Sequence, residues 1–195
     1  MESFFSQAGT LLINTLFGLY ILAVLARFIL QLVRANFYNP FAQFLVVVTN
    51  PPLLPLRRII PGLWGIDWAS VLLMLLLEAI EQYLLALLRG YSVTGTMLTV
   101  LSISQIADLV LYVFLFAILI RAILSWIAPY PHNPAMDLLV SLTEPLLRPA
   151  RRIIPPIGGL DLSPVAVLIL IELAIMLVDH LTMGMARLVV TSPSG

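Results

Sequence analysis

The feature that most constrains this chain is a proline- and arginine-rich stretch that occurs twice, each time between two long apolar runs. The first copy, at 49–70, reads TNPPLLPLRRIIPGLWGIDWAS, and the second, at 143–164, reads TEPLLRPARRIIPPIGGLDLSP. Residue 57 recurs at 151, a shift of 94 positions, and the same shift extends without a gap into the apolar runs on both sides. Such a fixed internal period indicates a tandem duplication of one structural unit.

The composition places this unit in a membrane. The 195 residues are 61% hydrophobic and 10% charged, whereas soluble proteins are roughly 45–50% apolar and about 25% charged. All basic residues are arginine and they equal the acidic residues in number, so no excess of charge attracts nucleic acid. Because the chain has no cysteine, it offers neither a disulfide nor a thiolate metal ligand.

Four apolar segments are long enough to cross a bilayer, which takes about 20 helical residues. We therefore predict an all-α polytopic membrane protein with spans at about 11–33, 68–88, 106–127 and 162–180. The first unit then covers 1–90, a connecting loop 91–105, the second unit 106–190 and a tail 191–195. The N-terminus lacks the positive charge of a signal peptide, so we expect the first span to be retained.

Each unit carries a short helix and a proline-rich segment between its two spans. The Asn-Pro pairs at 39–40 and 133–134 have the pattern of an N-cap followed by proline at the first helical position. The first short helix is expected to end near residue 49, because the prolines that follow remove backbone donors. We expect these helices to lie in the membrane interface, with a re-entrant position as the alternative, and the proline-rich segment to form a bent loop outside the hydrocarbon. Asp67 and Asp161 are placed to cap the spans that follow.

Arginine placement predicts the orientation. The loops inside the two units hold six of the ten basic residues: Arg34, Arg57, Arg58, Arg148, Arg151 and Arg152. Short cytoplasmic loops carry the positive excess of membrane proteins, so we expect both loops to be cytoplasmic and both termini to be periplasmic. Two spans per unit make the repeats parallel.

Ionisable residues inside predicted spans are costly, and they are candidates for function. Each unit supplies the same pair, Arg27 with Glu78 and Arg121 with Glu172. The simpler interpretation is an ion pair that clamps two adjacent helices. The alternative is that these groups handle ions or protons.

The basic loops are the other candidate site. Its residues are Arg57, Arg58, Arg148, Arg151 and Arg152. They could serve to set topology and contact anionic lipid headgroups, or the rigid prolines could hold them as a docking surface for a cytoplasmic protein. No catalytic, metal-binding or cofactor-binding motif is present, and neither His132 nor His180 forms a metal site with a nearby His or Cys. We therefore expect no enzyme.

The second copy of the repeated stretch, with its Asn-Pro pair and flanking spans, resembles the signature of the YggT family, small integral membrane proteins that include the YlmG proteins. The first copy departs from the second by having Asn50 in place of Glu144 and Trp64 in place of Gly158. A chain with two units is similar to the proteobacterial form, and this resemblance implies the bacterial inner membrane.

The resemblance implies no reaction and no catalytic residues. It links the chain in general terms to cell division and membrane organisation, to cytochrome assembly, and to osmotic or ion homeostasis. We expect a non-enzymatic membrane organiser or assembly factor whose basic loops contact lipid or a partner protein. The alternative is an ion or osmolyte channel or transporter, acting as a homo-oligomer.

Overall fold

The computed structural model describes residues 4–127, 133–154 and 161–191. These residues form the six helices α1 (Phe4–Leu32), α2 (Pro40–Ile59), α3 (Trp68–Arg89), α4 (Gly95–Ile127), α5 (Pro134–Ile153) and α6 (Ser163–Thr191). The described part of the chain contains no β-strand beyond one isolated bridge. The all-α fold predicted from the sequence is confirmed.

Four of these helices are long and apolar enough to cross a membrane: Phe4–Leu32, Trp68–Arg89, Gly95–Ser125 and Ser163–Ala186. They match the four predicted spans, but each is longer than expected, the second by a single residue. Much of the expected connecting loop at 91–105 is helical, because α4 already begins at Gly95. The hydroxyl of Thr94 accepts a hydrogen bond from the Met97 amide, and Thr99 donates to the Gly95 carbonyl, so these residues support the first turn instead of forming a loop.

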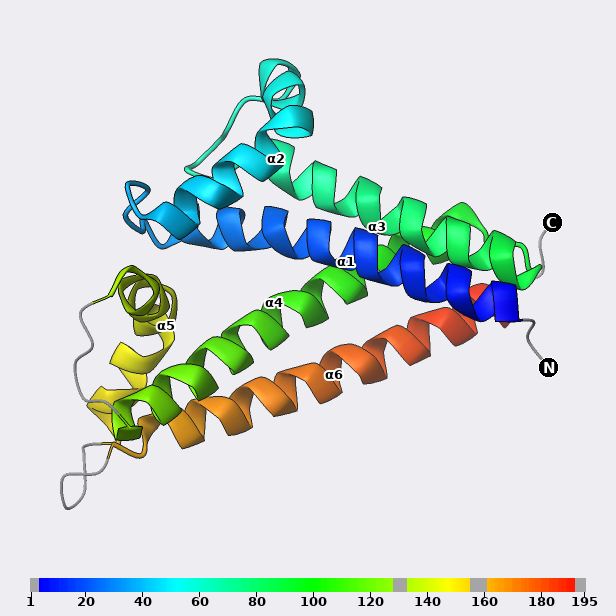
Figure 1. The fold of residues 1–195 in the computed structure, drawn as a ribbon. Helices are drawn as coiled ribbons and strands as arrows, with labels where there is room; N and C mark the ends of the chain where they lie inside the picture. The colour runs from blue at the N-terminus through cyan, green and yellow to red at the C-terminus, as the bar shows by residue number, and fades with distance from the viewer. Residues whose placement is uncertain (1–3, 128–132, 155–160, 192–195) are drawn as a thin grey trace.

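The spans pack as two antiparallel pairs, α1 with α3 and α4 with α6, and α3 against α4 joins the pairs (Figure 1). One apolar core lies between α1, α2 and α3 and includes Val24, Leu25, Leu53 and Met74. A smaller core around Ile118 joins α4, α5 and α6. Each unit therefore has its own core, in keeping with a duplication.

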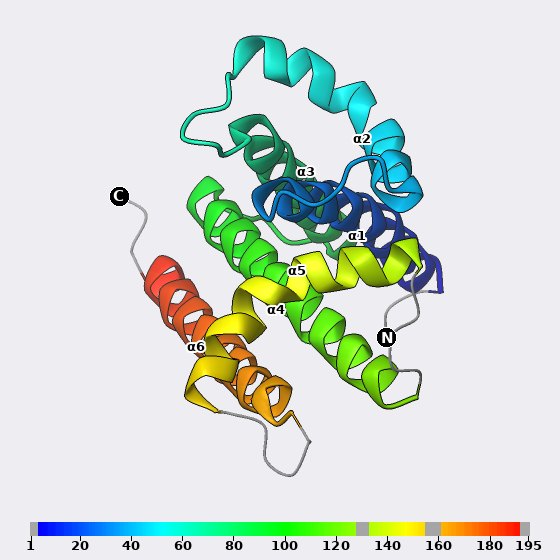
Figure 2. The ribbon, with the colours of Figure 1, turned by 90° about the vertical axis from the view of Figure 1, so that its left-hand side faces the viewer.

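α2 and α5 cross the same end of the four spans, as Figure 2 shows, and the first residue of α1 and the last of α6 lie at the other end (Figure 1). A parallel pair of repeats requires this arrangement. The two crossing helices meet where Asn39, the N-cap of α2, donates from Nδ2 to the carbonyl of Pro134, 2.6 Å away. We call this the α2/α5 end.

The prolines do not end these crossing helices, which corrects the expectation of short helices followed by a non-helical loop. Pro51, Pro52 and Pro55 lie inside α2, and Pro145 and Pro149 lie inside α5. A proline removes an amide donor but keeps a helical φ, so the chain continues helically while a carbonyl four residues earlier loses its partner. Val48 lies four residues before Pro52, so its carbonyl has no amide donor within the helix. It accepts a hydrogen bond from the Tyr20 hydroxyl at 3.3 Å instead.

A tight turn connects α2 to α3. Leu63 and Ile66 form a two-way backbone bridge around Trp64 and Gly65, both of which have positive φ, 56° and 78°. Such a turn suits glycine but is unusual for tryptophan. The matching turn of the second unit, with Gly158 and Gly159, lies outside the described residues.

Candidate functional site

Arg27 fastens α1 to α2. Its side chain is buried, with 5% of the residue exposed, and its Nη1 donates to Thr49 Oγ1 at 2.7 Å and Asn50 Oδ1 at 2.9 Å. Thr49 in turn donates to the Leu45 carbonyl within α2. The arginine therefore holds the crossing helix at the turn that precedes its prolines.

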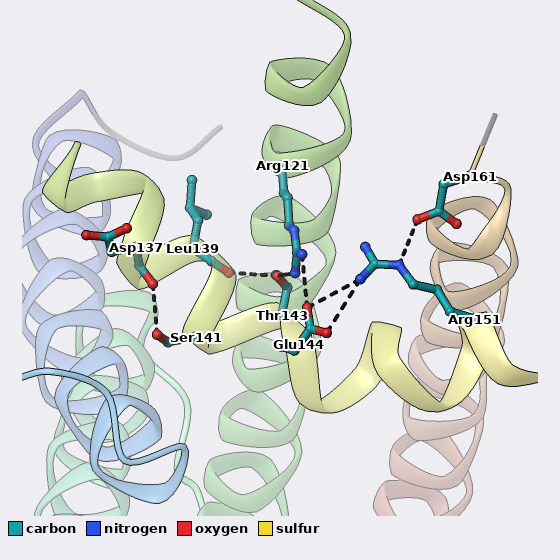
Figure 3. Close-up of polar contacts among 8 residues, drawn as sticks. All are labelled: Arg121, Asp137, Leu139, Ser141, Thr143, Glu144, Arg151 and Asp161. Carbon is teal, nitrogen blue, oxygen red and sulfur yellow. Dashed lines mark hydrogen bonds and ion pairs between the residues drawn. The ribbon is translucent and has the colours of Figure 1, made fainter. Parts of the chain in front are cut away.

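Arg121 makes the equivalent contact in the second unit (Figure 3). Its Nη1 donates to Thr143 Oγ1 at 2.6 Å, and its Nη2 donates to Glu144 Oε2 at 2.9 Å. Thr143 donates to the Leu139 carbonyl, as Thr49 does to Leu45. Both units thus use an arginine and a buried threonine to attach the crossing helix to a span.

These partners differ from the ones expected from the sequence. The described residues contain no ion pair between Arg27 and Glu78 or between Arg121 and Glu172. The long arginine side chains reach towards the α2/α5 end, where crossing helices offer oxygens close to the membrane surface. Glu172 is exposed on α6, and Glu78 accepts a hydrogen bond from Gln82 Nε2 at 3.0 Å.

The first arginine of each Arg-Arg pair is also engaged. Arg57 donates from Nε and Nη2 to Oδ2 of the buried Asp67, the N-cap of α3. Arg151 donates from Nε to Asp161 Oδ2 at 2.8 Å, just before α6. These pairs tie the end of each crossing helix to the start of the following span.

The two aspartates lie outside the spans, and the pKa of each is lowered in the same way. Burial by itself would raise the pKa of Asp67, but hydrogen bonds from Arg57 and Ser70 and the Arg57 charge hold that pKa below its usual value. Burial also opposes ionisation of Asp161, but Ser163 and Arg151 lower its pKa. Both carboxyls are therefore held as carboxylates that keep their ion pairs.

The two units differ in how their arginines are connected. Glu144 accepts from Arg121 and also from Arg151 at 3.4 Å, so one chain of contacts runs from Arg121 through Glu144 and Arg151 to Asp161 (Figure 3). This chain holds two positive and two negative groups. The first unit has the neutral Asn50 at the matching position, so its two arginines face only one carboxylate.

Three arginines of the candidate set remain exposed. Arg58, Arg148 and Arg152 form no hydrogen bond or ion pair with any described residue. Near Arg58 in the chain, Trp64 is 94% exposed at the tip of its turn, and Ile59 is also largely exposed. Trp64 was not singled out as a site residue from the sequence, because its exposure follows from the turn geometry.

A cavity of about 340 Å³ lies between α1, α3 and α4, on the side of the spans away from α2 and α5. Its polar lining is Asn14, Glu78, Glu81, Gln82, Arg89 and Gln105. Glu78, Glu81 and Gln82 are spaced at i, i+3 and i+4, so they share one side of α3, whereas the contributions of α1 and α4 come from the folded chain.

The four apolar spans and the two crossing helices define a multi-pass helical membrane protein built from two parallel units. A family model described as CCB3/YggT matches residues 6–88 and 100–182, one match for each unit, and the chain belongs to this family. The predicted duplication is thereby confirmed.

Relatives with similar sequences are known from several bacteria. An uncharacterized protein of Pseudomonas aeruginosa is 49% identical over 175 residues, 89% of each chain. An uncharacterized protein of Vibrio alginolyticus is 44% identical over 84% of this chain and 89% of its own, and the uncharacterized protein YggT of Escherichia coli is 36% identical over 83% and 84%. No solved structure matches the chain significantly.

Proposed function

We propose that this protein is a non-enzymatic organiser or assembly factor of the bacterial inner membrane, with both termini periplasmic and the α2/α5 end cytoplasmic. The observation that carries the proposal is that four arginines are bonded within the fold while three others are exposed on the crossing helices. Arg27, Arg57, Arg121 and Arg151 hold the crossing helices in place. Arg58, Arg148 and Arg152 are left exposed on those helices.

The fastening makes α2 and α5 a fixed platform. An arginine of the preceding span secures the middle of each helix, and an ion pair with an N-cap or pre-helical aspartate secures its end. Binding to a platform held in this way costs little backbone entropy, because the backbone is already ordered. A charged headgroup or an acidic partner segment would then be met by preplaced guanidinium groups.

The chemistry of the platform suits a membrane surface. Exposed apolar residues of α2 and its following turn include Phe41, Phe44, Val47, Leu54, Ile59, Leu63 and Trp64. Tryptophan is favoured at the membrane interface, and each arginine near an anionic surface contributes about 1 kcal/mol of attraction. We propose that anionic lipid headgroups are the first ligands of the platform and that a partner protein docks on the same arginines.

The proposal is tested by lipid retention in nanodiscs that mix anionic and zwitterionic lipids. Native mass spectrometry should find anionic lipids enriched on the wild-type protein. Combined replacement Arg58→Ala, Arg148→Ala and Arg152→Ala should reduce that enrichment at least about tenfold, whereas Arg89→Ala, which removes an arginine at the opposite end, should not.

Equal enrichment in the triple variant would remove the basis for a lipid-binding platform. Ion flux through the purified protein in liposomes, above that of protein-free liposomes, would instead favour the channel alternative and count against the organiser.

A further inference from the structure

The cavity between α1, α3 and α4 contains a carboxylate that has no partner among the described residues. Glu81 is only 8% exposed and lines the cavity, yet it forms no hydrogen bond or ion pair with the residues that the structure describes. Glu78, 7% exposed, is its neighbour on α3 and is bonded to Gln82. A buried carboxylate without a partner is costly, so the arrangement calls for a compensating ligand.

The other polar groups of the cavity offer oxygen. Asn14 from α1, Gln82 from α3 and Gln105 from α4 each place an amide in its lining. Carboxylate and amide oxygens are ligands for hard cations. Glu78 and Glu81 carry two negative charges and Arg89, at the exposed end of α3, carries one positive charge, so the ionised cavity has a net negative charge.

The depth of the cavity favours a binding site over a pore that crosses the membrane. Along α3, Glu81 lies about 12 Å and Glu78 about 16 Å from Arg89, at 1.5 Å per residue. Towards the α2/α5 end the lining includes the buried Ile21, which belongs to the apolar core with Val24 and Met74. The cavity therefore reaches the middle of α3 and stops at packed apolar side chains.

The second unit has no equivalent of this cavity by sequence. Ile175 stands at the position of Glu81 and Tyr112 at that of Gly18, while Glu172, the equivalent of Glu78, is exposed. Gly18 lines the cavity, and a Cβ added there would meet no atom within 4 Å. The missing side chain at Gly18 thus helps to keep the space open in the first unit alone.

We propose that this cavity is a binding site for one small inorganic cation, held by Glu81 and Glu78 and by the surrounding amide oxygens. The cation enters from the end of the spans opposite α2 and α5. It stabilises the packing of α1, α3 and α4 and does not cross the membrane through a single chain.

The test measures thermal unfolding of the purified full chain at about pH 8, where carboxyls ionise. Sodium, potassium, magnesium and calcium chlorides are compared with choline chloride at matched ionic strength. At least one inorganic cation should raise the wild-type Tm saturably, by about 4 °C or more. Glu81→Gln and Gly18→Leu should abolish the increase, and Glu172→Gln, at the matched exposed position, should keep it.

A second measurement covers the case in which a variant does not fold. A hydrophobic carbodiimide should modify Glu81 in the wild-type protein in membranes, and the effective cation should slow that modification at least threefold. No Tm increase with any inorganic cation, an equal increase in Glu81→Gln or with choline, or modification that is indifferent to cations would overturn the proposal.

Discussion

At the scale of single residues, the exchange of Asn50 for Glu144 sets the charge balance of each unit. Glu144 neutralises Arg121 and Arg151 together, and Asp161 completes the balance. In the first unit the buried Arg27 is satisfied by neutral oxygens alone. The hydrogen bonds of Arg27 therefore depend on Thr49 and Asn50 being held in position, and the Arg57–Asp67 ion pair fixes the end of that helix.

The Arg57–Asp67 pair should make stability depend on pH in the acid range. The pKa of Asp67 is lower in the folded protein than in the unfolded chain, so its contribution is complete above the unfolded value of about 3.9 and is lost as the pH falls through the folded value. Arg57→Ala should lower the free energy of unfolding by about 2 kcal/mol at neutral pH and should weaken the acid dependence.

Unfolding of the detergent-solubilised protein between about pH 7 and pH 3 measures both effects. Arg58→Ala is the matched control, because the neighbouring arginine is exposed and unpaired among the described residues. A variant at Arg57 as stable as the one at Arg58, across the whole range, would show that the ion pair contributes nothing.

At the scale of elements, α2 and α5 are helices that continue through prolines, and in α2 a neighbouring span replaces one of the lost backbone bonds. The Tyr20 hydroxyl on α1 donates to the Val48 carbonyl, to which Pro52 has no N–H to offer. α5 has fewer internal prolines, and its unit has Phe114 at the position of Tyr20. The helix with more broken backbone bonds is thus the one that receives a side-chain donor.

Tyr20→Phe should therefore destabilise the first unit by about 1 kcal/mol, the usual contribution of one hydrogen bond. Tyr112→Phe removes a hydroxyl from an exposed ring that makes no hydrogen bond with described residues, and it should change stability by less than about 0.5 kcal/mol. Unfolding in mixed micelles gives both values. Indistinguishable stabilities of the two variants would mean that the Val48 carbonyl needs no donor from α1.

At the scale of the whole molecule, the two units lie parallel and share one end for their crossing helices. Contact between α3 and α4 and the hydrogen bond from Asn39 to Pro134 join them. Arg58, Arg148 and Arg152 consequently lie at the same end of the spans, and the acidic cavity lies in the opposite half of the first unit.

This arrangement predicts a definite membrane topology. The chain has no cysteine, so Ser92→Cys and Ser141→Cys each provide a single thiol, at opposite ends of the spans. An impermeant maleimide added to spheroplasts should label the cysteine at position 92, and it should label the one at 141 only after the membrane is opened. The reverse pattern would place α2 and α5 outside the cell and contradict the proposed cytoplasmic platform.

The sequence by itself determined the elements that depend on local spacing. Apolar length predicted the four spans, the 94-residue shift predicted the duplication, and the Asn-Pro pairs predicted where α2 and α5 begin. The N-cap role of Asp67 was also predicted correctly. Each of these properties is set by neighbours within a few turns of the chain.

Only the tertiary structure decided which polar groups meet. Spacing along a helix gives depth but not the rotation of one helix against another, so Arg27 was expected beside Glu78 and is bonded to Thr49 instead. For the same reason the cavity around Glu81 could not be predicted from the sequence, because its lining residues come from three helices. Likewise, the sequence did not show that the Val48 carbonyl, which has no amide partner at Pro52, accepts from Tyr20, because only the packing of α1 on α2 brings these two residues together.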